Sequence, residues 1–271
     1  MPEFLGINTS GDGSAVPIQL AECGAGWVRC VVREQIDITS WIVQLRERHR
    51  IETLLIGDGS PDSLGPDESA WRARMEMYKA RYGEIVKLWQ WGNEPDHDGM
   101  ASWKMDRPTV NRLVRLAREI FPREEGFTLV APGLVSGNWM WLEDTTDGNG
   151  DEMIDFSPVD ALDLHPYAKE PNTEPLIAMF RDYRAAFDRV GGAEKPIWCT
   201  EYDSRTPGMG PDLISRADRF AVMCWSSDMT VTEDLRLGII DGLDRMNHFR
   251  LAAGLTAFAA QAELDGIRAL A

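Results

Sequence analysis

The chain has 271 residues, of which 44% are hydrophobic and 27% are charged. This composition is that of a folded globular protein, and the length favours a single domain over residues 1–271, of the size of an α/β barrel. Asp and Glu number 44 against 28 Lys and Arg, which gives a formal net charge of -16. Because so acidic a surface repels phosphate groups, we expect neither nucleic acid nor a membrane as a partner.

Two features of the sequence bear on its compartment. No segment approaches the roughly 20 apolar residues that span a bilayer, and the N-terminal MPEFLGINTS lacks the basic and apolar regions of a signal peptide. We therefore expect a cytoplasmic protein, with release by lysis or by a non-classical route as the alternative. The four cysteines, Cys23, Cys30, Cys199 and Cys224, have no Cys-x-x-Cys spacing. Free thiols are expected, with two disulfides as the less favoured alternative.

Short apolar runs bounded by turn residues recur along the chain, and helix-like stretches lie between them. This alternation predicts parallel strands covered by helices. The expected strands are Phe4–Asn8, Trp27–Val32, Thr53–Gly57, Lys87–Gly92, Phe127–Pro132, Val159–His165, Pro196–Glu201 and Phe220–Trp225. The expected helices are Ile38–Arg48, Glu68–Tyr82 (with Pro66-Asp67 as its cap), Thr109–Phe121, Glu174–Val190, Asp212–Arg219 and Arg245–Leu264.

The number of strands decides the expected architecture. Eight strands in 271 residues match a closed (β/α)8 TIM barrel, which typically has about 250 residues. An open doubly wound sheet usually carries a glycine-rich phosphate loop after its first strand. The segment Gly-Asp-Gly-Ser at 11–14 does not fit Gly-x-Gly-x-x-Gly. The expected fold class is therefore α/β, a single-domain (β/α)8 barrel.

Polar residues end several of the expected strands, and the carboxyl ends of barrel strands form the active site. Glu94 follows the fourth run and Glu201 ends the seventh. His165 ends the sixth run, and Arg29 lies within the second. We expect these side chains to face the same opening.

Side chains alternate along a strand, which gives a further expectation for the fourth and seventh runs. If Glu201 points into the barrel, Ile197 and Cys199 do too. By the same rule, Glu94 groups with Gly92 and Gln90.

The motif Asn-Glu-Pro at 93–95, together with Glu201 after the seventh strand, resembles the retaining glycoside hydrolases built on (β/α)8 barrels, above all their family 39 and family 5 branches. Gly-Trp-Val-Arg at 26–29 is similar to their second strand. Trp-Ser-Ser-Asp at 225–228, followed by Leu-Gly-Ile-Ile-Asp at 237–241, is similar to their eighth strand and the turn after it. The resemblance spans the chain from about Phe4 to Phe249 and rests on the combination of these positions with His165 and Trp225.

The resemblance implies a double-displacement mechanism with two carboxylates. Glu94 would be the general acid/base, and Glu201 would be the nucleophile that forms a covalent glycosyl-enzyme. Arg29 would keep Glu201 ionised, the aromatic rings of Trp89 and Trp91 would flank the strand that leads to Glu94, and Asn93 would hydrogen-bond the sugar 2-hydroxyl. Retention implies carboxyl groups about 5–5.5 Å apart, whereas inversion needs roughly 6.5–9.5 Å. No cofactor is expected.

Other residues are expected to contact the substrate. The resemblance implies that His165 and Tyr167 orient the nucleophile or touch the sugar, with a purely structural His165 as the alternative. Trp225 would stack against a pyranose ring. Further sugar units would stack on Trp103, Trp139 and Trp141, which lie in segments after the fourth and fifth strands.

Two acidic segments raise the question of a metal. Asp96 and His97 lie beside Glu94, but with a catalytic Glu94 they are more simply polar loop residues, and we expect no metal there. The segment Asp147–Glu152 is similar to the start of a calcium loop. Residues 152 and 158 are not the Gly and Glu of an EF-hand, so only a looser calcium site stays open as an alternative.

The sequence thus favours a retaining β-glycosidase that takes a poly- or oligosaccharide substrate, with endo and exo action both open and no indication of the oligomeric state. A phage-type lysin acting on peptidoglycan is one alternative. Another is a non-catalytic carbohydrate-binding or assembly protein, against which the intact pair Glu94 and Glu201 argues. The third is a metal-dependent hydrolase centred on Asp96 and His97.

Overall fold

A computed structural model describes residues 5–9, 17–22, 26–57, 67–97, 104–135, 137–165, 181–201 and 219–222. Within these residues, eight parallel strands form one sheet in the order β5-β4-β3-β2-β1-β8-β7-β6. The strands are β1 (Leu5–Thr9), β2 (Trp27–Val31), β3 (Glu52–Gly57), β4 (Leu88–Trp91), β5 (Thr128–Val130), β6 (Leu162–Asp163), β7 (Ile197–Cys199) and β8 (Arg219–Val222). Each overlaps one predicted run, so the eight predicted strands are confirmed.

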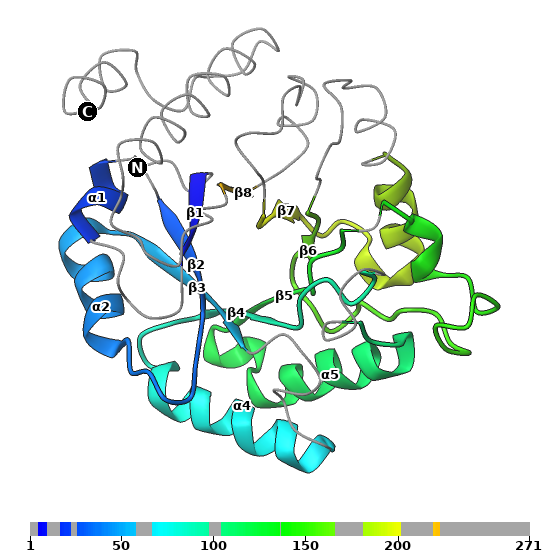
Figure 1. Ribbon diagram of the computed structural model, residues 1–271, viewed down its shortest axis with the longest axis horizontal. Coiled ribbons are helices and arrows are strands. Elements are labelled where there is room, and N and C mark those ends of the chain that lie inside the picture. Colours follow the sequence, from blue (N-terminus) through cyan, green and yellow to red (C-terminus); the bar gives the residue numbers. More distant parts are fainter. Residues whose placement is uncertain are drawn as a thin grey trace, which may run out of the picture.

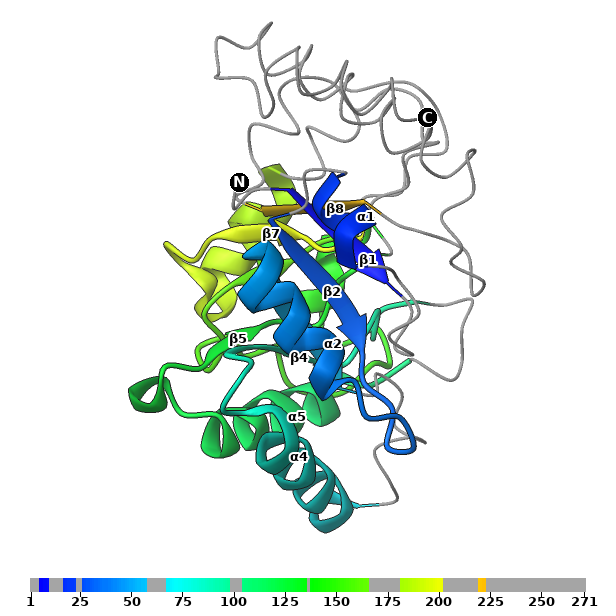
Figure 2. The same cartoon turned by 90° about the vertical axis from the view of Figure 1, so that its left-hand side faces the viewer.

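Helices pack on the outer side of the strands (Figure 1). They are α1 (Pro17–Glu22), α2 (Thr39–Gln44), α4 (Glu68–Tyr82) and α5 (Arg107–Ile120), with shorter helical turns at Leu45–His49, Arg123–Glu125, Trp139–Leu142 and Asp188–Gly192. Helices α4 and α5 lie side by side in both views (Figure 2). Asp67 caps α4 as predicted, because its carboxylate accepts the Ala70 N–H at 3.0 Å. Residues 181–187 are also helical. The predicted helices Asp212–Arg219 and Arg245–Leu264 lie outside the described residues except for Arg219, which begins β8 and is not helical.

Two hydrophobic clusters fill the two faces of the sheet. The larger one, called here the outer core, joins outward strand residues such as Trp89 to the apolar faces of α2, α4 and α5. The smaller one, called here the inner cluster, contains no helix residue. Its members are Trp27, Leu54, Val130, Ala161 and Trp198. The inner cluster therefore lies on the face of the sheet away from the helices.

The predicted alternation holds for one strand and fails for another. Gln90 of β4 points away from the helices, as expected, since its side chain contacts Arg29 of β2. In β7, however, Ile197 belongs to the outer core and Trp198 to the inner cluster. The prediction of an inward Ile197 is therefore wrong. It assumed that strand alternation continues as far as Glu201, but β7 ends at Cys199, so alternation does not set the direction of the Glu201 side chain.

The two aromatic rings expected beside the strand that leads to Glu94 lie on the helix-facing side of that strand. Trp89 and Trp91 stack on each other with ring centroids 6.0 Å apart. Both contact Phe121, which follows α5. Because these rings lie in the outer core, they stabilise the packing of helices on β4 and leave the other face of the strand to polar residues.

The two edge strands of the sheet approach each other. Isolated parallel bridges pair Val130 with Ala161 and Leu134 with Leu164. The Ala131 N–H donates to the Ala161 carbonyl at 2.9 Å. These contacts bring the carboxyl end of β5 beside the segment that contains β6.

Two further expectations concern the compartment. None of the described helices is long and apolar enough to cross a bilayer. Cys30 is buried and forms no disulfide, as predicted. The side chains of Cys23, Cys199 and Cys224 lie outside the described part of the chain.

Candidate active site

The two predicted carboxylates lie just past the carboxyl ends of β4 and β7. Glu94 is 4% exposed and Glu201 is 8% exposed, which is unusually low for ionisable side chains. A tight turn fixes the backbone at Glu94, where Gly92 has φ 87° and Glu94 itself has φ 47°. The Glu94 N–H donates to the Gly133 carbonyl at 2.9 Å. A non-glycine residue in the left-handed region is strained, and such strain concentrates at functional sites.

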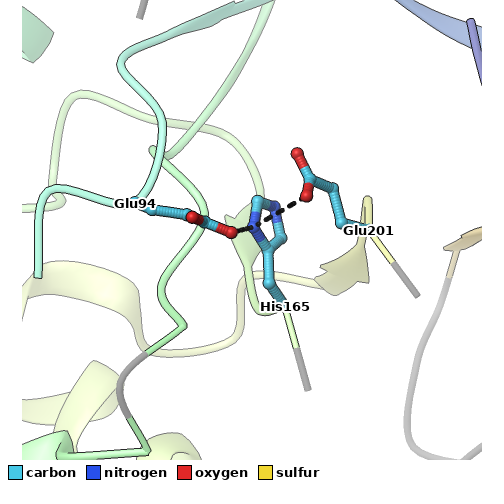
Figure 3. Close-up of side chains that lie close together, drawn as sticks. All are labelled: Glu94, His165 and Glu201. Atoms are coloured by element: carbon cyan, nitrogen blue, oxygen red, sulfur yellow. Dashed lines mark hydrogen bonds and ion pairs between the residues drawn. The ribbon is translucent and has the colours of Figure 1, made fainter. Parts of the chain in front are cut away.

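The imidazole of His165 lies between the two carboxylates (Figure 3). Its Nδ1 is 2.8 Å from Glu94 Oε1 and 3.7 Å from Glu201 Oε2. One oxygen of each carboxylate and one ring nitrogen all lie within 4.8 Å of one another. The ring packs against Gly133, where an added Cβ would lie 2.1 Å from Nε2. Only glycine at 133 leaves room for His165 in this position.

Arg29 connects four side chains from its position in β2, where it is 2% exposed. Its Nη1 donates to Glu201 Oε1 at 2.5 Å and to Asn8 Oδ1 at 3.2 Å. Its Nε donates to Gln90 Oε1 at 2.7 Å, and its Nη2 donates to Asn93 Oδ1 at 2.7 Å. Because a guanidinium only donates, it holds the Glu201 carboxylate and turns the amide NH2 of Asn93 away from itself.

Three buried polar residues beneath the carboxylates were not predicted as site residues. Gln90 Nε2 donates to Asp163 Oδ2 at 2.6 Å. Thr200 donates to Asp163 twice, from Oγ1 to Oδ2 at 2.5 Å and from its backbone N–H to Oδ1 at 2.9 Å. Asp163 and Thr200 each lie two residues after a member of the inner cluster, namely Ala161 and Trp198. That spacing is the sequence signal that points them to the same face of the sheet.

The charge of His165 follows from the carboxylates around it. Burial by itself lowers its pKa, but the negative charges of Glu201 and Asp163 and hydrogen bonds to Asp163 and Glu94 outweigh burial and raise the pKa to about 10. Asp163 Oδ2 lies 3.3 Å from Nε2. The surrounding carboxylates therefore favour the protonated form of His165.

The spacing of three side chains in the site raises the question of a metal. Among the described residues, Glu94, His165 and Glu201 form a group with metal-ligand spacing. His165 Nδ1 already shares a hydrogen bond with Glu94 Oε1 at 2.8 Å, and Arg29 donates to Glu201 Oε1, so we interpret the group as a hydrogen-bonded acid–base cluster. Asp96 and His97 are not part of the group. Asp96 is buried and accepts the Val135 N–H at 3.1 Å, which fixes the loop after β4.

Of the aromatic residues predicted to contact the substrate, the structure describes Trp139 and Trp141. Trp141 is 3% exposed and belongs to the outer core, so its ring is not available for stacking on a sugar. Trp139 is half-buried, and the Arg189 guanidinium lies 6.0 Å from its ring centroid. Trp103, Tyr167 and Trp225 lie outside the described residues.

The segment Asp147–Glu152 is organised around an arginine. Arg107, which is fully buried, donates to both carboxylate oxygens of Asp147 at 2.8 and 3.0 Å. It also donates to the carbonyls of Gly150 at 2.7 Å, Glu152 at 2.9 Å and Trp141 at 2.8 Å. The guanidinium thus places a positive charge among the oxygen atoms where a calcium ion would bind.

Comparison with solved structures identifies similar folds. A GH39 enzyme from Xanthomonas axonopodis pv. citri matches with a TM-score of 0.53 at 15% identity, over 81% of this chain and 57% of that chain. A glucosidase from Croceicoccus marinus matches with a TM-score of 0.62 at 10% identity, over 89% of this chain and 66% of that chain. A GH128 subgroup II endo-β-1,3-glucanase from Sorangium cellulosum matches with a TM-score of 0.52 at 16% identity, over 83% of this chain and 89% of that chain.

No protein-family model matches the sequence, and no curated protein matches it. The chain spans less than two thirds of the GH39 enzyme and of the glucosidase. At these identities the likeness concerns the fold alone. The chain has an α/β fold with a parallel sheet, and it shares this fold with glycoside hydrolases.

Proposed function

We propose that this chain is a glycoside hydrolase that cleaves β-linked poly- or oligosaccharides with retention of anomeric configuration, on a closed, single-domain (β/α)8 barrel. The observation that carries the proposal is the pairing of Glu94 and Glu201, buried at the carboxyl ends of two strands with one oxygen of each within 4.8 Å. Such an approach favours retention, because an inverting enzyme needs roughly 6.5–9.5 Å between its carboxyl groups. The bridges between β5 and the β6 segment support closure of the barrel.

The two carboxylates have unlike surroundings, which double displacement requires. Glu201 is ion-paired with Arg29 at 2.5 Å, so its charge is compensated and it suits the role of nucleophile. Glu94 contacts no arginine or lysine among the described residues. Its Oε1 faces His165, which leaves Oε2 as the oxygen that would exchange a proton with the substrate.

In the first step, a Glu201 oxygen attacks the anomeric carbon and the bond to the leaving oxygen breaks. Glu94 gives its proton to that oxygen, so the leaving group departs as an alcohol and a glycosyl ester of Glu201 remains. In the second step, Glu94 takes a proton from water, and the water oxygen attacks the anomeric carbon. The ester bond breaks, which regenerates the Glu201 carboxylate and a protonated Glu94.

Asn93 contributes through the direction of its amide. Because Oδ1 accepts from Arg29, the NH2 group points away from the guanidinium and would donate to the sugar 2-hydroxyl. In this chemistry that hydrogen bond strengthens as the anomeric carbon gains positive charge. Arg29 therefore positions both the nucleophile and the 2-hydroxyl contact.

The test is release of reducing ends from β-glucans, xylan, mannan and peptidoglycan by the wild type, Glu94→Ala and Glu201→Ala. Glu125→Ala, which removes an exposed glutamate far along the chain from either, serves as the matched control. We expect activity on one polymer class, lost at least 10³-fold in both site variants and unchanged in the control. With an aryl β-glycoside whose leaving group departs without a proton, azide should restore turnover to Glu94→Ala and give the β-glycosyl azide, because azide attacks the glycosyl ester without a general base. NMR of the first product of the wild type should show the retained β-anomer.

Equal activity in the wild type and both site variants would overturn the assignment of the carboxylates. An inverted first product would keep the glycosidase but reject the double displacement. Binding of a glycan without turnover by the wild type would favour a carbohydrate-binding protein instead.

A further inference from the structure

Asp163 is a carboxylate that the proposed mechanism does not use. It is fully buried in the layer between the inner cluster and the two catalytic carboxylates. Gln90 and Thr200 donate three hydrogen bonds to its two oxygens at 2.5–2.9 Å. Each of these partners is a donor in that contact, and an ionised carboxylate only accepts. The surroundings of Asp163 therefore suit a buried negative charge, which needs a positive partner.

The hydrogen atoms around His165 identify that partner. Thr200 Oγ1 has one hydrogen, and it lies 2.5 Å from Asp163 Oδ2 and 3.0 Å from His165 Nε2. Since the Asp163 carboxylate has no hydrogen to give, the hydroxyl donates to Asp163 and can only accept from His165. Nε2 must therefore carry a proton.

The second ring nitrogen of His165, Nδ1, also carries a proton in the state that could protonate a substrate. Nδ1 lies 2.8 Å from Glu94 Oε1, so this contact holds one proton between them. For Glu94 to present an acidic proton on Oε2 to a substrate, Oε1 must accept from Nδ1. The reactive state then has protons on both ring nitrogens, and His165 carries a positive charge.

The charges of this state cancel only if Asp163 is included. Arg29 and His165 are positive, Glu201 and Asp163 are negative, and a protonated Glu94 is neutral. Without Asp163 the same buried group would carry one net positive charge, and it would lose a proton at lower pH. We propose that Asp163 is a positioning residue that keeps a proton on both ring nitrogens of His165, so that Nδ1 donates to Glu94 Oε1 and the proton that Glu94 gives to a substrate lies on Oε2. The charge of His165 stands by itself, whereas its effect on catalysis rests on the proposed function.

The experiment follows the ring nitrogens of His165 by NMR in the full chain, with ¹⁵N-labelled histidine, from pH 5 to 9.5. The chain has four histidines, and the signals of His165 are assigned by their loss in His165→Gln. In the wild type we expect imidazolium shifts up to at least pH 8.5. Asp163→Asn removes the charge and should lower the pKa of His165 by roughly 1–3 pH units.

Asp160→Asn is the matched control, because Asp160 lies three residues earlier and binds Arg118 and Arg123 rather than the site. It should leave the His165 signals unchanged. In the glycosidase assay, the alkaline limb of kcat/KM should move to lower pH in Asp163→Asn by about the same amount as the pKa of His165.

The outcomes separate this inference from the proposed function. Ordinary titration of wild-type His165 near pH 6.5 would overturn the inference, and this measurement needs no variant to fold. An unchanged pKa of His165 in Asp163→Asn, or an equal shift in Asp160→Asn, would also overturn it. The expected NMR result without any hydrolysis would support the role of Asp163 in charging His165 and count against the glycosidase.

Discussion

The contact between Gly133 and His165 gives a prediction that depends on a single methyl group. In Gly133→Ala, the new Cβ would lie 2.1 Å from His165 Nε2 and 2.4 Å from Cε1. Ordinary van der Waals contact begins near 3.4 Å, so the ring or the backbone must move by more than 1 Å. The backbone is held in place, because the Gly133 carbonyl accepts the Glu94 N–H at 2.9 Å. The imidazole is therefore the part that moves.

The cost of this movement is worked from the bonds that the ring would lose. Its contacts at 2.8 Å with Glu94 and at 3.0 Å with Thr200 do not survive a shift of that size. Overpacking a buried position costs about 1–3 kcal/mol of unfolding free energy, and a 1 Å misplacement of a catalytic group costs about 10²-fold in rate. We expect both losses in Gly133→Ala, measured by urea unfolding and by kcat/KM on the polymer that the wild type cleaves.

Gly126→Ala is the control for this change. Gly126 has φ 82° and no heavy atom within 4 Å of an added Cβ, so alanine there costs about 1 kcal/mol through backbone strain alone. Its kcat/KM should equal that of the wild type. If Gly133→Ala kept wild-type activity and stability, the packing of His165 against residue 133 would have no functional meaning.

Three further outcomes are expected. Arg107→Met should lose about 3–5 kcal/mol of unfolding free energy in urea, because it removes the ion pair with Asp147 and leaves three carbonyls without the guanidinium donor. A loss below about 1 kcal/mol would contradict this. The hydrogen bonds from Arg107 hold the pKa of Asp147 well below its usual range. The stability that this pair gives the wild type is therefore complete above about pH 4 and is lost as the pH falls further. In Arg107→Met, the unfolding free energy should fall less between about pH 4 and pH 2 than it does in the wild type. Asn93→Asp should lower kcat/KM about 10²-fold on the cleaved substrate but little on its 2-deoxy analogue, and an equal loss on both would reject the 2-hydroxyl contact.

The periodic apolar pattern predicted the positions of the strands and helices, because residues buried on a face of the sheet are apolar and recur at regular spacing within each segment. The strand–helix alternation predicted all eight described strands, and the Pro-Asp signal predicted the start of α4. The pattern failed at β7, where a strand of three residues is too short for its alternation to reach Glu201. The direction of Glu201 is set instead by Arg29, which lies 172 residues away in the sequence.

The carboxylates could be predicted because strand ends place them, whereas their supporting residues depend on contacts between strands. Asp163 and Thr200 look like ordinary polar residues in an apolar run until β6 and β7 are paired. Pairing brings their side chains together above Ala161 and Trp198. In both segments, a polar residue follows a buried apolar residue by two positions and so points to the same face of the sheet. The sequence shows this spacing, but it indicates a shared site only once the two strands are known to be neighbours.

The segment Asp147–Glu152 shows why a local motif alone does not identify its ligand. Carbonyl and carboxylate oxygens that converge on one point suit calcium, and they suit an arginine fork equally, because both present positive charge to lone pairs. The motif binds an arginine instead of calcium when the fold brings a guanidinium to these oxygens. Arg107 lies 40 residues before Asp147 and uses all five of its N–H groups on this segment and on Trp141. Calcium should therefore leave the thermal unfolding of the wild type unchanged, because the guanidinium already places a positive charge where the ion would bind.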